Sequence, residues 1–153
     1  MRRIILTITI FAMALTTLGC GGSKTPTCSD SQVTNTVIQI ATEQIQNASV
    51  SQLIISEWGQ SPGTVGNPTY NDLLDYSGDN TEAVQSIVKM VDEQIASLGL
   101  SISAIRTSSV DETTKKCECE ATIDNKTGDS YPIQYTAQDT DDGDGVYVEV
   151  FGL

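Results

Sequence analysis

Three cysteines are the residues of this chain best suited to chemistry. Cys117 and Cys119 are separated by a single residue, so their side chains point the same way if the segment is a strand. Cys28 lies far away in the sequence and could join them in the folded domain. Three thiolates can hold Cu(I) or zinc, and a pair of thiols can exchange electrons. One hypothesis is therefore a thiol-based redox or metal-handling protein.

The start of the chain predicts where in the cell the protein is located. Two arginines precede an apolar segment over residues 4–18. This segment is too short to span a membrane, which takes about 20 residues. A charged start followed by a short apolar segment is typical of a secretory signal peptide. The motif Thr17-Leu18-Gly19-Cys20 resembles the lipobox of bacterial lipoproteins, although that family prefers leucine where Thr17 stands. The resemblance implies removal of residues 1–19 and acylation of Cys20, for example with palmitate. The alternative is ordinary secretion with cleavage after Ala14.

Lipidation would place the protein in the cell envelope. Gly21 follows Cys20 where the resemblance implies an aspartate for inner-membrane retention, so the outer membrane is favoured, facing the periplasm or the surface. Residues 20–28 are expected to form the lipidated cysteine and a flexible tether, and residues 29–153 a single domain.

Export also favours a plain interpretation of the cysteines. Exported proteins can form and keep disulfides. A direct bridge between Cys117 and Cys119 would strain a strand, so we expect Cys28 to bond to one of them and to leave the other free. The chain has no histidine to complete a common metal site, and redox enzymes more often use C-x-x-C at a helix start. A structural bridge is therefore preferred over a redox or metal site.

An acidic segment near the C-terminus resembles a calcium loop only superficially. Its register fails, because Thr140 would take the first ligand position and Phe151 the twelfth, where a bidentate carboxylate belongs. Asp-Gly pairs between two alternating segments instead indicate a hairpin turn. The aspartates are thus weak metal candidates: Asp139, Asp141, Asp142 and Asp144.

Composition excludes some classes of function. The net charge of −12 argues against nucleic acid as a partner. Without histidine, no imidazole can serve as a catalytic base, and no phosphate loop, zinc helix motif or nucleophile elbow is present. A Ser–Lys or paired-carboxylate mechanism stays open, but nothing singles out its residues. We expect neither enzymatic activity nor a cofactor.

The periodicity of apolar residues predicts the elements. Helical spacing runs from about Asp30 to Ile55 and again up to Leu98, before Gly99, with a loop over residues 59–69 between them. After Gly99 the period changes to two, in four segments with one apolar and one polar face. The expected fold is α+β, with two helices packed on one face of a four-stranded antiparallel meander sheet. This order of elements resembles the cystatin-like and nuclear transport factor 2-like folds in topology only, which carries little functional weight.

These observations favour a lipid-anchored, non-catalytic envelope module that binds an unidentified envelope protein or peptide, as an inhibitor, immunity factor or assembly accessory would. The polar face of the sheet and the loop over residues 59–69 are candidate surfaces. Trp58, the only tryptophan, is a weak candidate for contacting a partner, because such a residue more often covers the end of a core. A surface-coating lipoprotein without a dedicated ligand is a third possibility.

Overall fold

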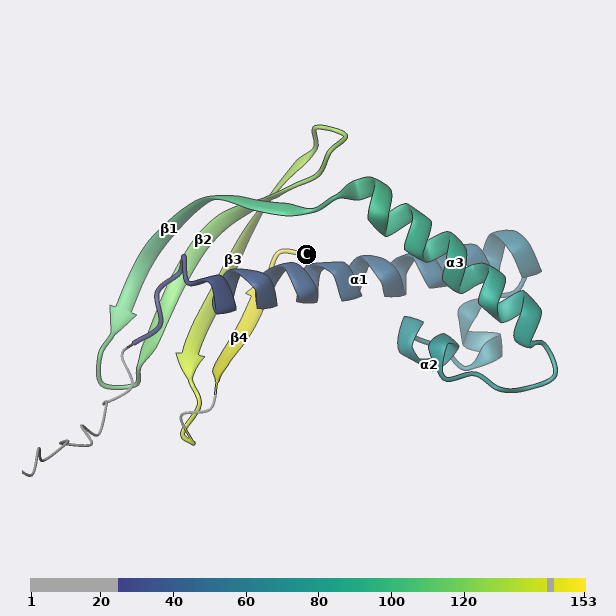
Figure 1. Ribbon diagram of the computed structural model, residues 1–153, viewed down its shortest axis with the longest axis horizontal. Helices are drawn as coiled ribbons and strands as arrows, with labels where there is room; N and C mark the ends of the chain where they lie inside the picture. Colours follow the sequence, from purple (N-terminus) through teal and green to yellow (C-terminus); the bar gives the residue numbers. More distant parts are fainter. Residues whose placement is uncertain (1–24, 143–144) are drawn as a thin grey trace, which may run out of the picture.

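The computed structural model describes residues 25–142 and 145–153 (Figure 1). The predicted signal peptide, Cys20, the start of the tether and Asp144 lie outside this range. The α+β class and the antiparallel sheet are confirmed. In chain order the elements are α1 (Ser31–Trp58), the 3-10 helix η1 (Pro62–Val65), α2 (Tyr70–Leu74), α3 (Thr81–Leu98), β1 (Ser101–Asp111), β2 (Lys116–Asp124), β3 (Ser130–Asp139) and β4 (Val146–Phe151).

The four strands form a meander in the order β1-β2-β3-β4, and every neighbouring pair is antiparallel. The β2–β3 register is regular over its whole length, whereas the β1–β2 register shifts twice, between Ser103 and Arg106 and between Thr107 and Ser109. Ala104, in the first irregularity, has a φ of 49°. Because bulges bend a strand, β1 curves around the N-terminal half of α1 (Figure 1).

Two hydrophobic clusters share the long helix α1. Its first half contributes Val33 and Val37 to a cluster with the inner face of the sheet, and its second half contributes Val50 and Ile54 to a cluster with α2 and α3. A helix of 28 residues is about 42 Å long, whereas the nine residues of β2 span about 30 Å. The end of α1 therefore projects past the sheet and needs a partner of its own (Figure 1).

That partner is α3. The apolar stripe of α3 is buried in the helical cluster, and none of its described residues belongs to the cluster beneath the sheet. The two long helices thus have different packing partners, a difference that the sequence does not predict. Helix α1 packs on the sheet, and α3 packs on the part of α1 that extends past the sheet. The buried residues of α3 are Val84, Ile87, Val88 and Val91.

Substituting Ile54 should show how much the helical cluster contributes to stability. Its side chain is fully buried, so we expect Ile54→Ala to lower the free energy of unfolding by about 2–5 kcal/mol, through lost burial and the cavity left behind. The matched control is Ile55→Ala next to it, which is 55% exposed and should change stability by less than about 0.5 kcal/mol. Urea unfolding of both variants makes the comparison, and equal effects would contradict this packing.

Candidate functional site

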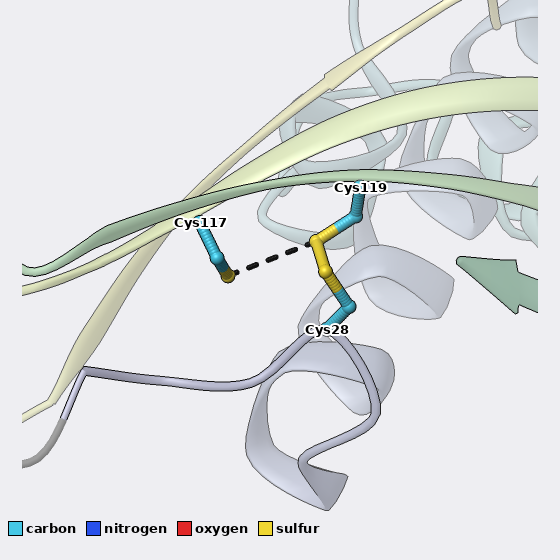
Figure 2. A group of neighbouring side chains, drawn as sticks. All are labelled: Cys28, Cys117 and Cys119. Atoms are coloured by element: carbon cyan, nitrogen blue, oxygen red, sulfur yellow. Dashed lines mark hydrogen bonds between the residues drawn. A yellow bond between two sulfur atoms is a disulfide. The ribbon is translucent and has the colours of Figure 1, made fainter. Parts of the chain in front are cut away.

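A disulfide fastens the beginning of the domain to the centre of the sheet. Cys28, three residues before α1, is bonded to Cys119 in β2, 91 residues away in the sequence, with their Cα atoms 5.7 Å apart (Figure 2). Both residues are buried in the cluster beneath the sheet. This is one of the two bridges that the sequence allowed.

The remaining thiol lies against this bridge. Cys117 and Cys119 alternate with the exposed Glu118, so strand geometry turns both cysteines inward. The Sγ atom of Cys117 is 3.7 Å from that of Cys119, and the ligand atoms of all three cysteines lie within 4.8 Å of one another (Figure 2). Burial raises the pKa of the Cys117 thiol, and the negative charge of Asp30 acts in the same direction.

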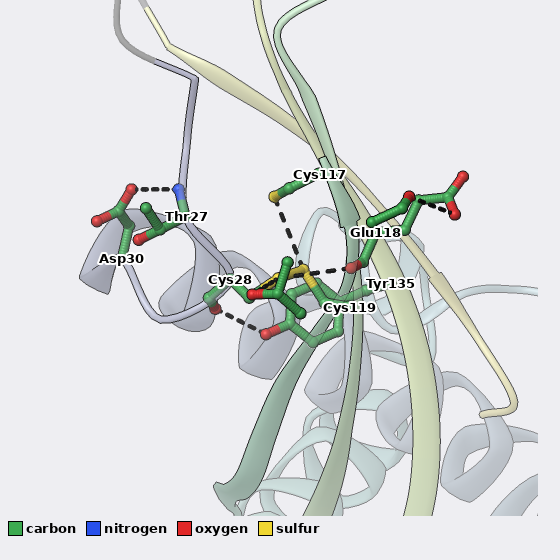
Figure 3. Close-up of a disulfide and its surroundings, with 9 residues drawn as sticks. Thr27, Cys28, Asp30, Cys117, Glu118, Cys119 and Tyr135 are labelled. Atoms are coloured by element: carbon green, nitrogen blue, oxygen red, sulfur yellow. Dashed lines mark hydrogen bonds between the residues drawn. A yellow bond between two sulfur atoms is a disulfide. The ribbon is translucent and has the colours of Figure 1, made fainter. Parts of the chain in front are cut away.

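Hydrogen bonds hold Cys28 in place (Figure 3). The Tyr135 hydroxyl donates to the Cys28 carbonyl oxygen at 2.7 Å in the buried core, and the Thr107 hydroxyl donates to Cys28 Sγ at 3.3 Å. Burial raises the pKa of Tyr135 to about 12, so this hydroxyl stays protonated at any physiological pH. The period-two pattern of β3 predicts that Tyr135 points inward. It cannot predict the partner, which is 107 residues away.

The Tyr135 hydroxyl should contribute measurably to stability. In Tyr135→Phe the buried carbonyl of Cys28 would lose its donor, so we expect a loss of about 1–3 kcal/mol in the free energy of unfolding. Tyr147→Phe is the control, because it removes an exposed hydroxyl that donates to Glu149 and should change little. Urea unfolding under non-reducing conditions measures both. If Tyr135→Phe left the free energy of unfolding unchanged, this would show that water replaces the hydroxyl as the donor to the Cys28 carbonyl.

In the oxidised state the three sulfur atoms are poorly arranged for exchange. A thiolate attacks a disulfide along the axis of the S–S bond. If the sulfur atoms of Cys117, Cys119 and Cys28 lay on such a line, those of Cys117 and Cys28 would be more than about 5 Å apart, because a disulfide bond is about 2.05 Å long. All three ligand atoms lie within 4.8 Å of one another, and the Sγ atoms of Cys117 and Cys119 are 3.7 Å apart. The sulfur atoms instead form a triangle. Burial also raises the pKa of the Cys117 thiol, which lowers the fraction present as the nucleophilic thiolate.

The acidic segment is the turn between β3 and β4. The Thr140 amide donates to the Gly145 carbonyl oxygen at 3.1 Å, and the Gly145 amide donates to the Thr140 hydroxyl at 3.2 Å. Asp139 is the last residue of β3, while Asp141 and Asp142 are exposed in the turn. Over residues 25–142 and 145–153, the three cysteines are the only close group of three potential metal ligands. The hairpin interpretation thus fits the geometry.

Trp58 and the following loop lie at the far end of α1. Trp58 is the last residue of the helix, is half-buried, and packs against the helical cluster, as expected of a residue that covers the end of a core. Gly59 ends the helix in the left-handed conformation with a φ of 62°. The loop over residues 59–69 contains η1. The outer face of the sheet has an ion pair of 2.8 Å between Arg106 and Glu120, and it also exposes the aromatic residues Tyr147 and Phe151.

An apolar groove lies where the two clusters meet. It has a volume of about 510 Å³ and opens between the middle of α1, the connection from α3 to β1, and the C-terminus, which lies beside α1 (Figure 1). Two of its large apolar residues are exposed: Tyr131 at 54% and Leu153 at 45%. Its segments are far apart in the sequence, so no local pattern reveals it. Its apolar lining includes Ile45, Ala48, Leu98, Leu100, Tyr131 and Leu153.

The chain matches no protein-family model, and no curated protein or solved structure is significantly similar to it. Within the part of the chain that the structure describes, no helix is both long enough and apolar enough to cross a membrane. The function is therefore inferred from the residues and their geometry.

Proposed function

We propose that this protein is a lipid-anchored, non-catalytic module of the cell envelope that binds a protein or peptide partner through the apolar groove. The groove carries the proposal. Large exposed apolar residues that gather around a cavity are typical of binding sites, because water covers such surfaces at a free-energy cost. Tyr131 and Leu153 are positioned to contact apolar side chains of a partner, and Ile45 and Leu100 line the groove.

Two separate features support a location in the cell envelope. The lipobox-like motif ending at Cys20 would attach the chain to a membrane, and residues following it would act as the tether. The Cys28–Cys119 disulfide joins this end of the domain to the sheet, and disulfides of this kind persist in oxidising compartments outside the cytosol.

Site-specific photo-cross-linking in living cells tests the groove. A photoreactive phenylalanine analogue at position 131 should give an adduct of one defined mass. The matched control is the same analogue at position 147, because Tyr147 is equally exposed, at 57%, but lies on the outer face of β4, away from the groove.

A second substitution makes this test specific. Leu153→Asp places a charge in the groove without disturbing a buried residue, and we expect it to abolish the adduct at position 131. Circular dichroism of this variant would verify that the fold is retained. An adduct at position 147 alone would move the partner to the polar face of the sheet. No adduct at either position, or an adduct insensitive to Leu153→Asp, would contradict binding in the groove.

A further inference from the structure

We propose that the three cysteines, once reduced, form a binding site for a single soft cation, Cu(I), and that the disulfide is the closed, metal-free form of this site. This inference does not depend on the groove or on its partner. It rests on the convergence of three buried sulfur atoms from two segments of the chain, Cys28 before α1 and Cys117 and Cys119 in β2 (Figure 2).

The triangle of sulfur atoms is close to the size that such an ion requires. Metal–thiolate bonds of about 2.3 Å in a trigonal plane put the sulfur atoms about 4 Å apart. Cys117 and Cys119 are already 3.7 Å apart, and all three ligand atoms lie within 4.8 Å of one another. Only Cys28 and Cys119 must separate, by about 2 Å, and rotation of their side chains can provide this movement once the bond is broken.

The ligand set favours Cu(I) over zinc. Thiolates are soft ligands, and three of them complete the coordination of Cu(I). Structural zinc sites almost always have four ligands, and this chain has no histidine to supply the fourth. All three cysteines are buried in the cluster beneath the sheet, which would shield a bound ion from water. Tyr135 holds the backbone of Cys28 beside this position through its hydrogen bond.

Opening the site requires a reductant. A dithiol would transfer two electrons and two protons to the Cys28–Cys119 bond, forming two thiols, and would itself become a disulfide. Cu(I) would then bind the three sulfur atoms as thiolates, and the thiol protons would pass to solvent. Copper enters and remains as Cu(I), so no further oxidant or reductant takes part.

A competition titration of the full chain tests the site. The protein is purified in detergent, reduced with a phosphine without oxygen, and titrated with Cu(I) against a chromogenic Cu(I) chelator. We expect one copper per chain, thiolate-to-copper absorption in the near ultraviolet, and a sulfur-only coordination shell in X-ray absorption. The oxidised protein should not compete with the chelator, because two of its three sulfur atoms are bonded to each other.

Cys117→Ser is the matched control, because it removes one ligand and leaves the native disulfide in place. We expect its reduced form to bind Cu(I) at least about 100-fold more weakly than the reduced unsubstituted protein. Equal binding by Cys117→Ser, or binding by the oxidised protein, would overturn the proposal. Circular dichroism follows the fold during the titration. Copper that binds only to an unfolded reduced chain, without restoring the fold, would also overturn it, as would tighter binding of zinc than of Cu(I).

Discussion

Cys28→Ser is expected to lower the free energy of unfolding by about 4 kcal/mol, because it removes the only disulfide among the described residues. The disulfide links residues 91 positions apart, and a cross-link that closes a loop of this length removes much of the conformational entropy of the unfolded chain. Its sulfur atoms are also buried in the cluster beneath the sheet, so the variant would lose part of that packing. Urea unfolding under non-reducing conditions, compared with the unsubstituted protein, measures the loss.

Two further cysteine variants distinguish the contribution of the disulfide to stability from that of side-chain packing. Cys117→Ala keeps the disulfide and should lose only about 1 kcal/mol, for one small buried side chain. In Cys119→Ser, the Cys117 thiol is close enough for Cys28 to bond to it instead, so we expect intermediate stability and no free thiol in the folded protein. Alkylation followed by intact-mass measurement detects this substitute bridge. Losses of equal size in Cys28→Ser and Cys117→Ala would mean that packing, and not the cross-link, stabilises the domain.

The cysteines also show how far the sequence could predict the site. The alternation of β2 places Cys117 and Cys119 on the inner face, and export favours a bridge to Cys28. Which of the two takes part depends on where the segment before α1 crosses the sheet. That position is fixed by long-range contacts, among them the hydrogen bond from Tyr135 to the Cys28 carbonyl, which no local pattern encodes.

Some features of the fold likewise depend on the local sequence, and others depend on contacts between distant segments. The apolar stripe of α3, the glycine at its end and the period-two strands are local features, and they predict the α+β class with its meander. The position of α3 depends on the length of α1 relative to the sheet, and so does the groove between the two clusters. The groove combines Ile45, Leu100, Tyr131 and Leu153, which come together only in the folded chain.

Cys20→Ser is expected to release the protein from the membrane. Cys20 ends the lipobox-like motif and lies outside the described residues. Mature bacterial lipoproteins carry at least two acyl chains, and two chains anchor a protein stably whereas one holds it only marginally. Without them, the net negative charge of the chain disfavours binding to anionic lipids. We expect most of the unsubstituted protein in the detergent phase after phase separation, and most of the Cys20→Ser variant in the aqueous phase.

The matched control is Cys117→Ala, which also removes a cysteine but leaves the motif intact and should stay in the detergent phase with the unsubstituted protein. Intact-mass measurement decides the chemistry independently. Acyl mass on a chain that begins at Cys20 would establish the anchor. A chain without acyl mass that begins at Leu15 would instead show ordinary secretion with cleavage after Ala14. In that case the module would bind its partner from solution, and the residues that follow Cys20 would not act as a tether between the domain and a membrane.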